Sequence, residues 1–235
     1  MVTLYDTNIQ RLFSRTAEAL AKEMNFMIKK KGSVTIALPG GRSILPLYAL
    51  FKSEHMFPWK HTHIFTVDER CVGNDDTENN FKLLKDNFID TLVEEKVLPE
   101  ANIHGYYGNS ENHEDSTNSY ASTLKKIGRY FDIVLLGVGE DGHVAALFPN
   151  HASIESADQY FITISDAPKP PPKRMSASPK LLLQSQIAFV FFIGEEKKEA
   201  YKKFLDTTIP IAECPAKIAL KIPKYYVITD RGEQS

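Results

Sequence analysis

The sequence predicts an α/β fold in which one doubly wound, mostly parallel sheet carries helices on both faces. Apolar segments of strand length alternate with amphipathic segments of helix length along almost the whole chain, which is typical of sheets built from strand–helix–strand units. The clearest strand, residues 133–138, is apolar at nearly every position, as strands buried on both faces are. The 235 residues contain no internal repeat and no convincing linker, so we expect a single domain over residues 1–235.

The spacing of the apolar residues places the elements in chain order. Residues 9–31 carry a helical apolar stripe, and Gly32 is expected to end this helix. Ser43 is expected to cap the next helix, whose first turn tolerates Pro46. The polar segment 109–119 is expected to be a surface loop. Strands are expected at 33–38, 63–67, 133–138, 161–165, 187–193 and 225–229, and helices at 43–52, 80–88, 120–130 and 195–205.

Composition and charge narrow the class of protein. The 28 basic and 30 acidic residues give a formal net charge of −2, which argues against a nucleic-acid or membrane-surface partner but leaves room for a local cationic pocket. Cys71 and Cys214 lie far apart without the spacing of metal ligands, so we expect no disulfide framework, no metal site and a reducing cytoplasm. No secretory signal or membrane-spanning apolar run is visible. A cytoplasmic enzyme or binding protein is the expected class.

The polar motifs of the chain all follow predicted strands. Because the carboxyl ends of parallel strands lie along one edge of a sheet, where α/β sheets bind their ligands, we expect these turns to meet in one site. They combine arginines, a lysine, carboxylates, a histidine and a helix start, which suits a small anionic substrate. The four turns are Pro39-Gly40-Gly41-Arg42-Ser43, Asp68-Glu69-Arg70, Gly139-Glu140-Asp141-Gly142-His143 and Gly194-Glu195-Glu196-Lys197.

His143 is the candidate general base, since an imidazole titrates close to working pH. The turn that carries it is rich in glycine, which lets the backbone bend sharply and lets another molecule approach closely. Asp141 either orients this imidazole, as a carboxylate does in a catalytic triad, or only forms the turn before Gly142.

The glycine turn after the first predicted strand is a candidate anion site. Its backbone N–H groups at a helix start suit a phosphate, although such a turn before a serine is often only structural. Arg70 and Lys197 can complete an anion pocket as charged donors. The alternative for each cation is a solvated surface charge.

The proline-rich segment 168–176 is stiff because each proline fixes its φ angle. Such stiffness can hold Lys169 and Arg174 over a pocket with little loss of entropy on binding. An ordinary surface loop and a ligand for a proline-recognition domain are the alternatives for this segment.

Together these motifs resemble the 6-phosphogluconolactonase family, and the resemblance covers most of the chain. The resemblance implies a Rossmann-like domain that hydrolyses 6-phospho-D-glucono-1,5-lactone to 6-phosphogluconate in the pentose phosphate pathway, without a metal or cofactor. It rests on the run Leu38 to Ser43, on Asp68-Glu69-Arg70, on Asn80, on the block from Gly137 to Pro149 (GVGEDGHVAALFP) and on residues 168–176 (PKPPPKRMS).

The resemblance also implies roles for individual residues. His143 becomes the base that takes a proton from the water attacking the lactone. The partner is then a small sugar phosphate lactone, and the protein is expected to be a monomer or a small homo-oligomer. The residues expected to contact the lactone are Gly40, Gly41, Arg42, Ser43, Asp68, Arg70, Asn80, Gly139, Gly142, Lys169, Arg174 and Lys197.

The chain departs from the family pattern at four positions. Gly73 stands where the family usually has proline, Asn79 stands where it has serine, and Ala145 and Ala146 replace a pair of small hydroxyl residues. These changes bear on the rate and the fine specificity more than on the reaction class.

Three alternative functions remain open. An amino-sugar-phosphate isomerase/deaminase shares the Asp-Gly-His loop, but those enzymes typically continue with Asn-Glu-Pro where this chain has Leu147-Phe148-Pro149. A non-catalytic sugar-phosphate-binding module is disfavoured by the presence of His143. The spacing of Gly137, Gly139 and Gly142 also fits a dinucleotide fingerprint, although Pro149 cuts short the helix that should follow.

Overall fold

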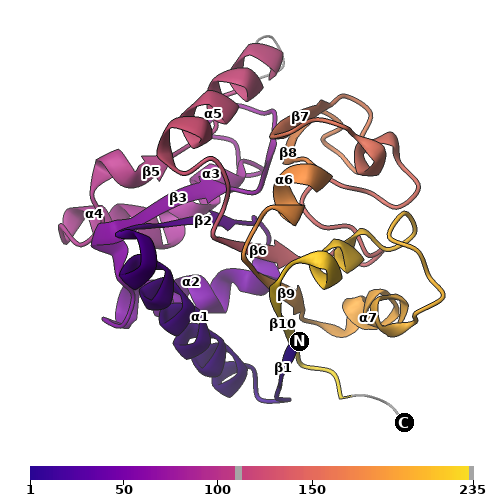
Figure 1. Ribbon diagram of the computed structural model, residues 1–235, viewed down its shortest axis with the longest axis horizontal. Helices are drawn as coiled ribbons and strands as arrows, with labels where there is room; N and C mark the ends of the chain where they lie inside the picture. The colour runs from indigo at the N-terminus through magenta and orange to yellow at the C-terminus, as the bar shows by residue number, and fades with distance from the viewer. Residues whose placement is uncertain (109–112, 233–235) are drawn as a thin grey trace.

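The computed structural model describes residues 1–108 and 113–232. Its main feature is a seven-stranded sheet in the order β1-β10-β9-β6-β2-β3-β5, in which every neighbouring pair of strands is parallel (Figure 1). This sheet confirms the predicted α/β fold. Its strands are β1 (Val2–Tyr5), β2 (Val34–Leu38), β3 (Thr62–Thr66), β5 (Ile103–His104), β6 (Ile133–Gly137), β9 (Ile187–Phe192) and β10 (Lys224–Thr229).

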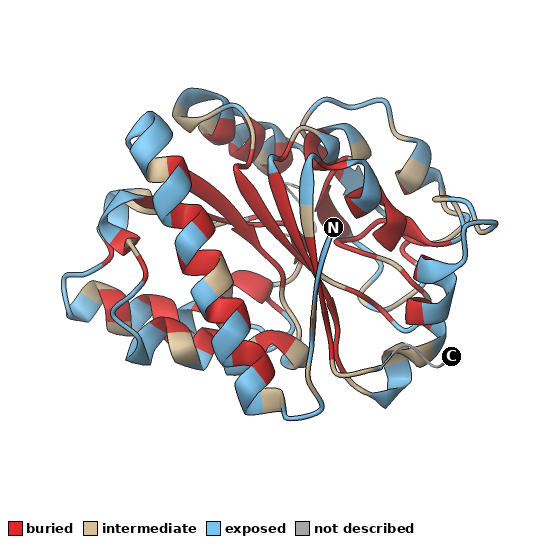
Figure 2. Cartoon of the chain, turned by 60° about the horizontal axis from the view of Figure 1, so that its bottom comes forward, coloured by how far each residue is buried: buried red, intermediate tan, exposed pale blue. Residues whose placement is uncertain are grey.

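Helices cover both faces of the main sheet, as predicted, and successive strand residues pack into two different hydrophobic clusters. In β6, Ile133 and Leu135 belong to one cluster, and Val134 and Leu136 belong to the other. Figure 2 shows the buried strands as a red layer between helices whose outer surfaces are exposed. This packing supports the expected single domain, which stays a prediction. The first cluster includes residues of α1 (Ile9–Lys31), α2 (Leu45–Ser53), α3 (Asn80–Leu84) and α4 (Asp90–Glu94), and the second includes residues of α5 (His113–Ile127), α6 (Pro179–Leu183) and α7 (Lys198–Leu205).

Helix α1 shows how local sequence sets the ends of an element. The side chain of Asn8 accepts a hydrogen bond of 3.0 Å from the N–H of Arg11 and so caps the first turn. Gly32 has a φ of 85°, which favours glycine, and its N–H donates to the carbonyl of Ile28 at 2.7 Å. The predicted helix 9–31 and its end at Gly32 are therefore confirmed.

A second, three-stranded antiparallel sheet was not predicted. β4 (Asp68–Arg70) pairs with β8 (Arg174–Ala177), which pairs with β7 (Phe161–Ile164). The interpretation of Asp68-Glu69-Arg70 as a turn is wrong, because these residues form β4. Three consecutive polar residues carry no apolar alternation, so only their pairing with a segment about a hundred positions away defines them as a strand.

Several smaller predictions also need correction. Ser43 caps no helix, because a 3₁₀ turn, Arg42–Ile44, precedes α2 and neither element has a side-chain cap. The expected loop 109–119 is helical from His113 onward, and residues 109–112 lie outside the described residues. The expected helix 80–88 runs through a π-helical turn, Lys85–Ile89, into α4, and the expected helix 195–205 starts with a 3₁₀ turn, Glu195–Lys197. The short strands β1 and β5 were missed.

A cluster of aromatic side chains holds α2 against the first hydrophobic cluster. The ring of Phe51 is fully buried, and its centroid lies 4.8 Å from Phe57, 5.0 Å from Trp59 and 5.2 Å from Phe88. In the sequence, α2 follows closely after the glycine turn at the end of β2. The packing of α2 therefore also fixes the position of that turn.

We predict that Phe51→Ala lowers the free energy of unfolding by about 3–5 kcal/mol, because it removes a buried ring and leaves a cavity. Urea unfolding measured by circular dichroism tests this. Phe26→Ala is the control, since that ring is 59% exposed on α1 and its removal should change stability by less than about 0.5 kcal/mol. Equal effects of the two substitutions would contradict the assigned packing.

Candidate active site

The four polar segments meet in one pocket at the point where the strand order reverses. In the sheet, β3 lies on one side of β2. On the other side lies β6, with β9 beyond it. Loops that leave neighbouring strands in opposite directions open a crevice at the carboxyl edge of a sheet, where α/β proteins bind ligands. The cavity has a volume of about 310 Å³ and is lined by Pro39, Gly40, Gly41, Arg42, Ser43, Asp68, Arg70, Asn80, Gly137, Val138, Gly139, Glu140, His143, Ala145, Lys169, Arg174, Glu196 and Lys197.

Most of the residues selected from the sequence therefore lie around one cavity. Gly142 and Asp141 are not among its lining residues. Gly142 has a φ of 96°, its carbonyl accepts a hydrogen bond from Ala216, and a Cβ at this position would lie 3.1 Å from the sulfur of Cys214. Gly142 thus shapes the turn, and its position gives no support to a contact with substrate.

The side chains of Asp141 and His143 form a hydrogen-bonded pair at the pocket wall. Asp141 Oδ1 lies 2.6 Å from His143 Nδ1 and also accepts the backbone N–H of His143 at 3.2 Å. The imidazole is 20% exposed and packs against the ring of Phe148, with centroids 4.8 Å apart. With Nδ1 engaged by the carboxylate, Nε2 is the ring nitrogen left for a proton transfer.

Gly139 allows this pair to form. A Cβ at position 139 would lie 2.0 Å from His143 Nδ1 and 2.7 Å from Asp141 Oδ1. Those distances are far shorter than any van der Waals contact, so only glycine permits the imidazole and carboxylate to stand where they do.

Lys169 and Arg174 connect the proline-rich segment to this pair. Lys169 Nζ lies 3.2 Å from Asp141 Oδ2. The guanidinium of Arg174 is largely buried and donates to the carbonyls of Lys169, Pro170 and Pro171 at 3.2, 3.0 and 2.8 Å. Arg174 therefore holds the segment in the shape that places Lys169 beside the carboxylate. Partial burial raises the pKa of Asp141, but the hydrogen bond and charge of His143, helped by Lys169, outweigh it and hold the pKa below its usual range.

The glycine turn after β2 has the properties of an anion site. Gly41 has a φ of 98°, and a Cβ on Gly40 would lie 1.8 Å from Asn80 Oδ1. Within the described residues, no hydrogen bond is formed by the backbone N–H groups of Gly40, Gly41 or Arg42. These N–H groups, at the start of the segment that leads into α2, are available to a negatively charged ligand.

Glu69 is a residue that the sequence did not single out. Its carboxylate is fully buried and accepts three backbone N–H groups, from Arg70 at 2.8 Å, Asn80 at 2.6 Å and Phe81 at 2.7 Å. It thereby joins β4 to the first turn of α3. Asn80 Nδ2 in turn donates to the carbonyl of Asp68 at 3.0 Å, so Glu69 fixes the wall that carries Asp68, Arg70 and Asn80. Its place between two candidate residues was the signal that could have found it.

The charges lining the pocket favour an anionic ligand. Five cationic side chains face three carboxylates: Arg42, Arg70, Lys169, Arg174 and Lys197 against Asp68, Glu140 and Glu196. Arg70 donates through one nitrogen to the carbonyl and carboxylate of Glu78, at 2.8 and 3.1 Å. Burial raises the pKa of Asp68, while the charges of Arg70, Arg174 and His143 act in the opposite direction.

The dinucleotide alternative finds no support in the geometry. No helix follows the glycine turn directly, and the chain instead forms a bridge between Val144 and Leu147 before the 3₁₀ turn Ala152–Glu155. A dinucleotide fingerprint needs a helix N-terminus at that place. Within residues 1–108 and 113–232, no group of three or more His, Cys, Asp or Glu side chains is arranged to hold a metal ion. No helix in the same ranges is long and apolar enough to cross a membrane.

A parallel α/β sheet with a cationic pocket at its switch point defines a protein that binds a small anionic ligand. Residues 7–225 match the family described as glucosamine-6-phosphate isomerases/6-phosphogluconolactonase, and the chain belongs to this family. It is 32% identical over 206 residues to the 6-phosphogluconolactonase of Borreliella burgdorferi, covering 88% of this chain and 87% of that protein.

Solved structures agree with the fold. A 6-phosphogluconolactonase from Thermotoga maritima superposes with a TM-score of 0.82 at 23% identity, over 97% of this chain and 98% of that one. A monomeric glucosamine-6-phosphate deaminase superposes with a TM-score of 0.78 at 20% identity, over 98% of each chain. At these identities the likeness shows the fold alone, and proteins named for each of the two activities in the family description have this fold.

We predict that Gly139→Ala separates the imidazole of His143 from Asp141 and lowers the free energy of unfolding by about 1–3 kcal/mol, because the methyl group has no space. Urea unfolding and the ¹⁵N resonances of the histidine rings measure the two effects. Gly73→Ala is the matched control, because a Cβ there meets nothing within 4 Å. An alanine at 139 that leaves both the stability and the ring resonances unchanged would refute the assigned contact.

We predict a pH-dependent stability difference between the wild type and Glu69→Gln. Burial raises the pKa of Glu69 from its ordinary value of 4.5 to about 8, although the three N–H donors act in the opposite direction. The folded state then holds a proton that the unfolded state has lost, so stability falls as the pH rises between these two values. The advantage of the wild type over the variant should shrink by about 1.4 kcal/mol per pH unit across that range, measured by urea unfolding. A constant difference would show that Glu69 is ionised throughout.

Proposed function

We propose that this protein hydrolyses 6-phospho-D-glucono-1,5-lactone to 6-phosphogluconate, a step of the pentose phosphate pathway. The observation that carries the proposal is the hydrogen-bonded pair of Asp141 and His143 in the wall of a pocket rich in cationic side chains. An imidazole fixed by a hydrogen bond can activate water, and cationic side chains bind a sugar phosphate. Membership of the family and the named 6-phosphogluconolactonase among the relatives support the same reaction.

His143 acts as the base in this mechanism. Its Nε2 accepts a proton from a water molecule while the oxygen of that water forms a bond to the lactone carbonyl carbon. The bond from this carbon to the ring oxygen then breaks, and the imidazolium returns its proton to the ring oxygen. The ring opens to the hydroxy acid, which loses a proton to solvent. No cofactor or metal ion takes part in these steps.

Asp141 positions the base and stabilises its charged form. The hydrogen bond to Nδ1 fixes the tautomer with the lone pair on Nε2, and the carboxylate offsets the positive charge that appears when the imidazole is protonated. Lys169 pairs with the other oxygen of Asp141 and keeps the carboxylate oriented.

The cationic side chains and the glycine turn bind the phosphate and stabilise the negative charge that forms on the carbonyl oxygen. The phosphate supplies binding energy away from the reacting bond and fixes the orientation of the ring. Negative charge grows on the carbonyl oxygen as water attacks, so an N–H or guanidinium donor close to that oxygen lowers the barrier. Arg42, Arg70, Arg174, Lys197 and the N–H groups of the glycine turn are the donors that divide these two tasks.

The two cysteines bear on the cellular compartment. Two buried free thiols, Cys71 and Cys214, fit a reducing compartment, and we place the reaction in the cytoplasm.

We predict that His143→Asn lowers kcat by about 10²–10⁴-fold, because the general base is lost while the shape of the pocket is kept. The lactone is generated in situ, and its disappearance is compared with the spontaneous rate in the absence of protein. His55→Asn, at an exposed position outside the pocket, is the control and should retain full activity.

Other results would point to other activities. Turnover of the lactone by His143→Asn at the wild-type rate would remove this imidazole from the mechanism. Release of ammonia from glucosamine 6-phosphate, with no lactone hydrolysis, would assign the deaminase activity of the family instead. Tight binding of the sugar phosphate with neither reaction would identify a binding module.

A further inference from the structure

Hydrolysis changes the charge of the ligand in the pocket. In the proposed reaction the lactone is charged only on its phosphate, whereas the hydroxy acid that forms loses a proton and gains a second negative group. In the transition state the negative charge on the carbonyl oxygen is balanced by the imidazolium of His143. Only the product therefore carries an uncompensated negative charge at the reacting carbon, and a carboxylate placed nearby would weaken product binding selectively.

Of the carboxylates that line the pocket in the described part of the chain, two are balanced by cations. The carboxylate of Glu196 lies 3.7 Å from the ammonium nitrogen of its neighbour Lys197. Asp68 is buried, and the positive charges of Arg70 and Arg174 act on its carboxylate. The negative charge of each of these two side chains is therefore offset within the pocket.

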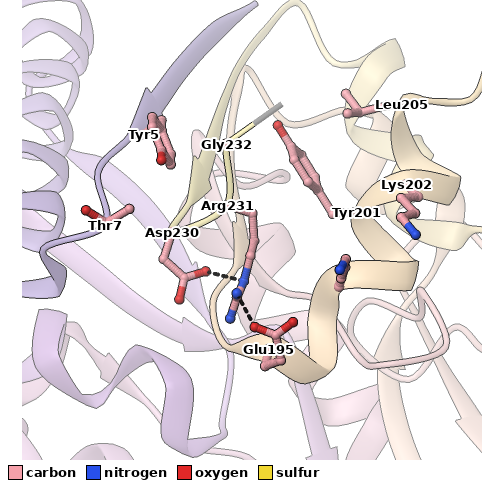
Figure 3. A pocket seen from close by; sticks show the side chains of 10 residues that line it. Tyr5, Thr7, Glu195, Tyr201, Lys202, Leu205, Asp230, Arg231 and Gly232 are labelled. Carbon is pink, nitrogen blue, oxygen red and sulfur yellow. Dashed lines mark hydrogen bonds and ion pairs between the residues drawn. The ribbon is translucent and has the colours of Figure 1, made fainter. Parts of the chain in front are cut away.

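The carboxylates on the outer side of the turn that carries Lys197 are paired as well. Arg231 forms ion pairs with both Glu195 and Asp230, as Figure 3 shows. Glu195 and Asp230 line a separate cavity beyond this turn and are not among the residues that line the pocket of His143. They therefore add no unpaired charge to the catalytic pocket.

Glu140 is the lining carboxylate that has no partner in the described part of the chain. It lies in the wall of the pocket and is exposed. Within residues 1–108 and 113–232, its side chain forms no ion pair and no hydrogen bond. An exposed glutamate without a partner is negatively charged at neutral pH. The steps of the proposed mechanism do not use this charge.

The backbone holds Glu140 in the same short turn as His143. The N–H of Gly142 donates to the carbonyl of Gly139 at 3.0 Å, which places Glu140 at a corner of the turn. The N–H of Gly139 donates to the carbonyl of His143 at 2.8 Å and closes the turn. The neighbouring Asp141 is engaged by the imidazole, whereas Glu140 lines the pocket. The charge of Glu140 thus lies within one turn of the imidazole beside which the new carboxylate forms.

We propose that Glu140 promotes release of the product by repelling its new carboxylate. The lactone and the transition state carry no uncompensated charge at the reacting carbon, so the repulsion acts on the product. A product that leaves readily does not compete with the next lactone molecule for the pocket. This role rests on the proposed function, whereas the repulsion itself can be measured without turnover.

Isothermal titration calorimetry with two ligands tests the repulsion. 6-Phosphogluconate carries the carboxylate, and glucitol 6-phosphate is the same open chain with a hydroxymethyl group in its place. Glu140→Gln should bind 6-phosphogluconate about 5-fold or more tightly than the wild type does, and its affinity for glucitol 6-phosphate should change much less. Because salt screens interactions between exposed charges, the difference should shrink in about 0.5 M NaCl.

Two further variants separate the charge of this side chain from its shape. Glu140→Asp keeps the charge and should discriminate between the two ligands as the wild type does. Glu155→Gln removes the same charge from an exposed glutamate outside the pocket and should also bind both ligands like the wild type. Equal affinity of the wild type and Glu140→Gln for 6-phosphogluconate overturns the proposal, as does an equal gain in affinity for both ligands.

Product inhibition then tests the role in turnover. The inhibition constant of 6-phosphogluconate against the lactone should fall in Glu140→Gln by the same factor as its dissociation constant. An unchanged inhibition constant overturns the role in release. Absence of lactone hydrolysis by the wild type overturns the proposed function and with it the release role, while the calorimetric comparison still decides the repulsion.

Discussion

The hydrogen bond between Asp141 and the imidazole of His143 determines what the pocket can do. It engages Nδ1 at 2.6 Å and leaves Nε2 as the only ring nitrogen able to take a proton from a ligand or water molecule. The bond depends on the backbone as much as on the two side chains, because a Cβ on Gly139 would occupy the space of the imidazole. Gly139 therefore serves the geometry of one hydrogen-bonded pair.

The rest of the pocket is held by two buried polar groups that bind backbone. The guanidinium of Arg174 donates to three consecutive carbonyls of the proline-rich segment, and the carboxylate of Glu69 accepts three N–H groups around β4 and α3. A buried polar group without such partners would cost several kcal/mol, so each of these segments has one strongly favoured arrangement. The lining side chains of the proline-rich segment, β4 and α3 are thereby pre-organised, which a catalytic site requires.

The main sheet and the position of the pocket could be predicted from the sequence, because both follow from local patterns. β6 and β9 are apolar along their whole length, α1 has a regular stripe, and parallel strands bring their following turns to one edge. The second sheet could not be predicted, since β4 is polar and is defined only by its pairing with β8. The same holds for Glu69, whose partners become visible only in three dimensions. Ser43 and Gly142 were assigned by motif, but Ser43 caps no helix and Gly142 shapes its turn without lining the pocket.

The tautomer of His143 at neutral pH decides whether this imidazole can act as the base. The ¹⁵N chemical shifts of both ring nitrogens can be measured by long-range correlation in uniformly labelled protein and assigned by comparison with His143→Asn. We expect a proton on Nδ1, hydrogen-bonded to Asp141, and an unprotonated Nε2. A proton on Nε2 with a bare Nδ1 would contradict it, because the pair would then hold the imidazole in a form that cannot take a proton from water in the pocket.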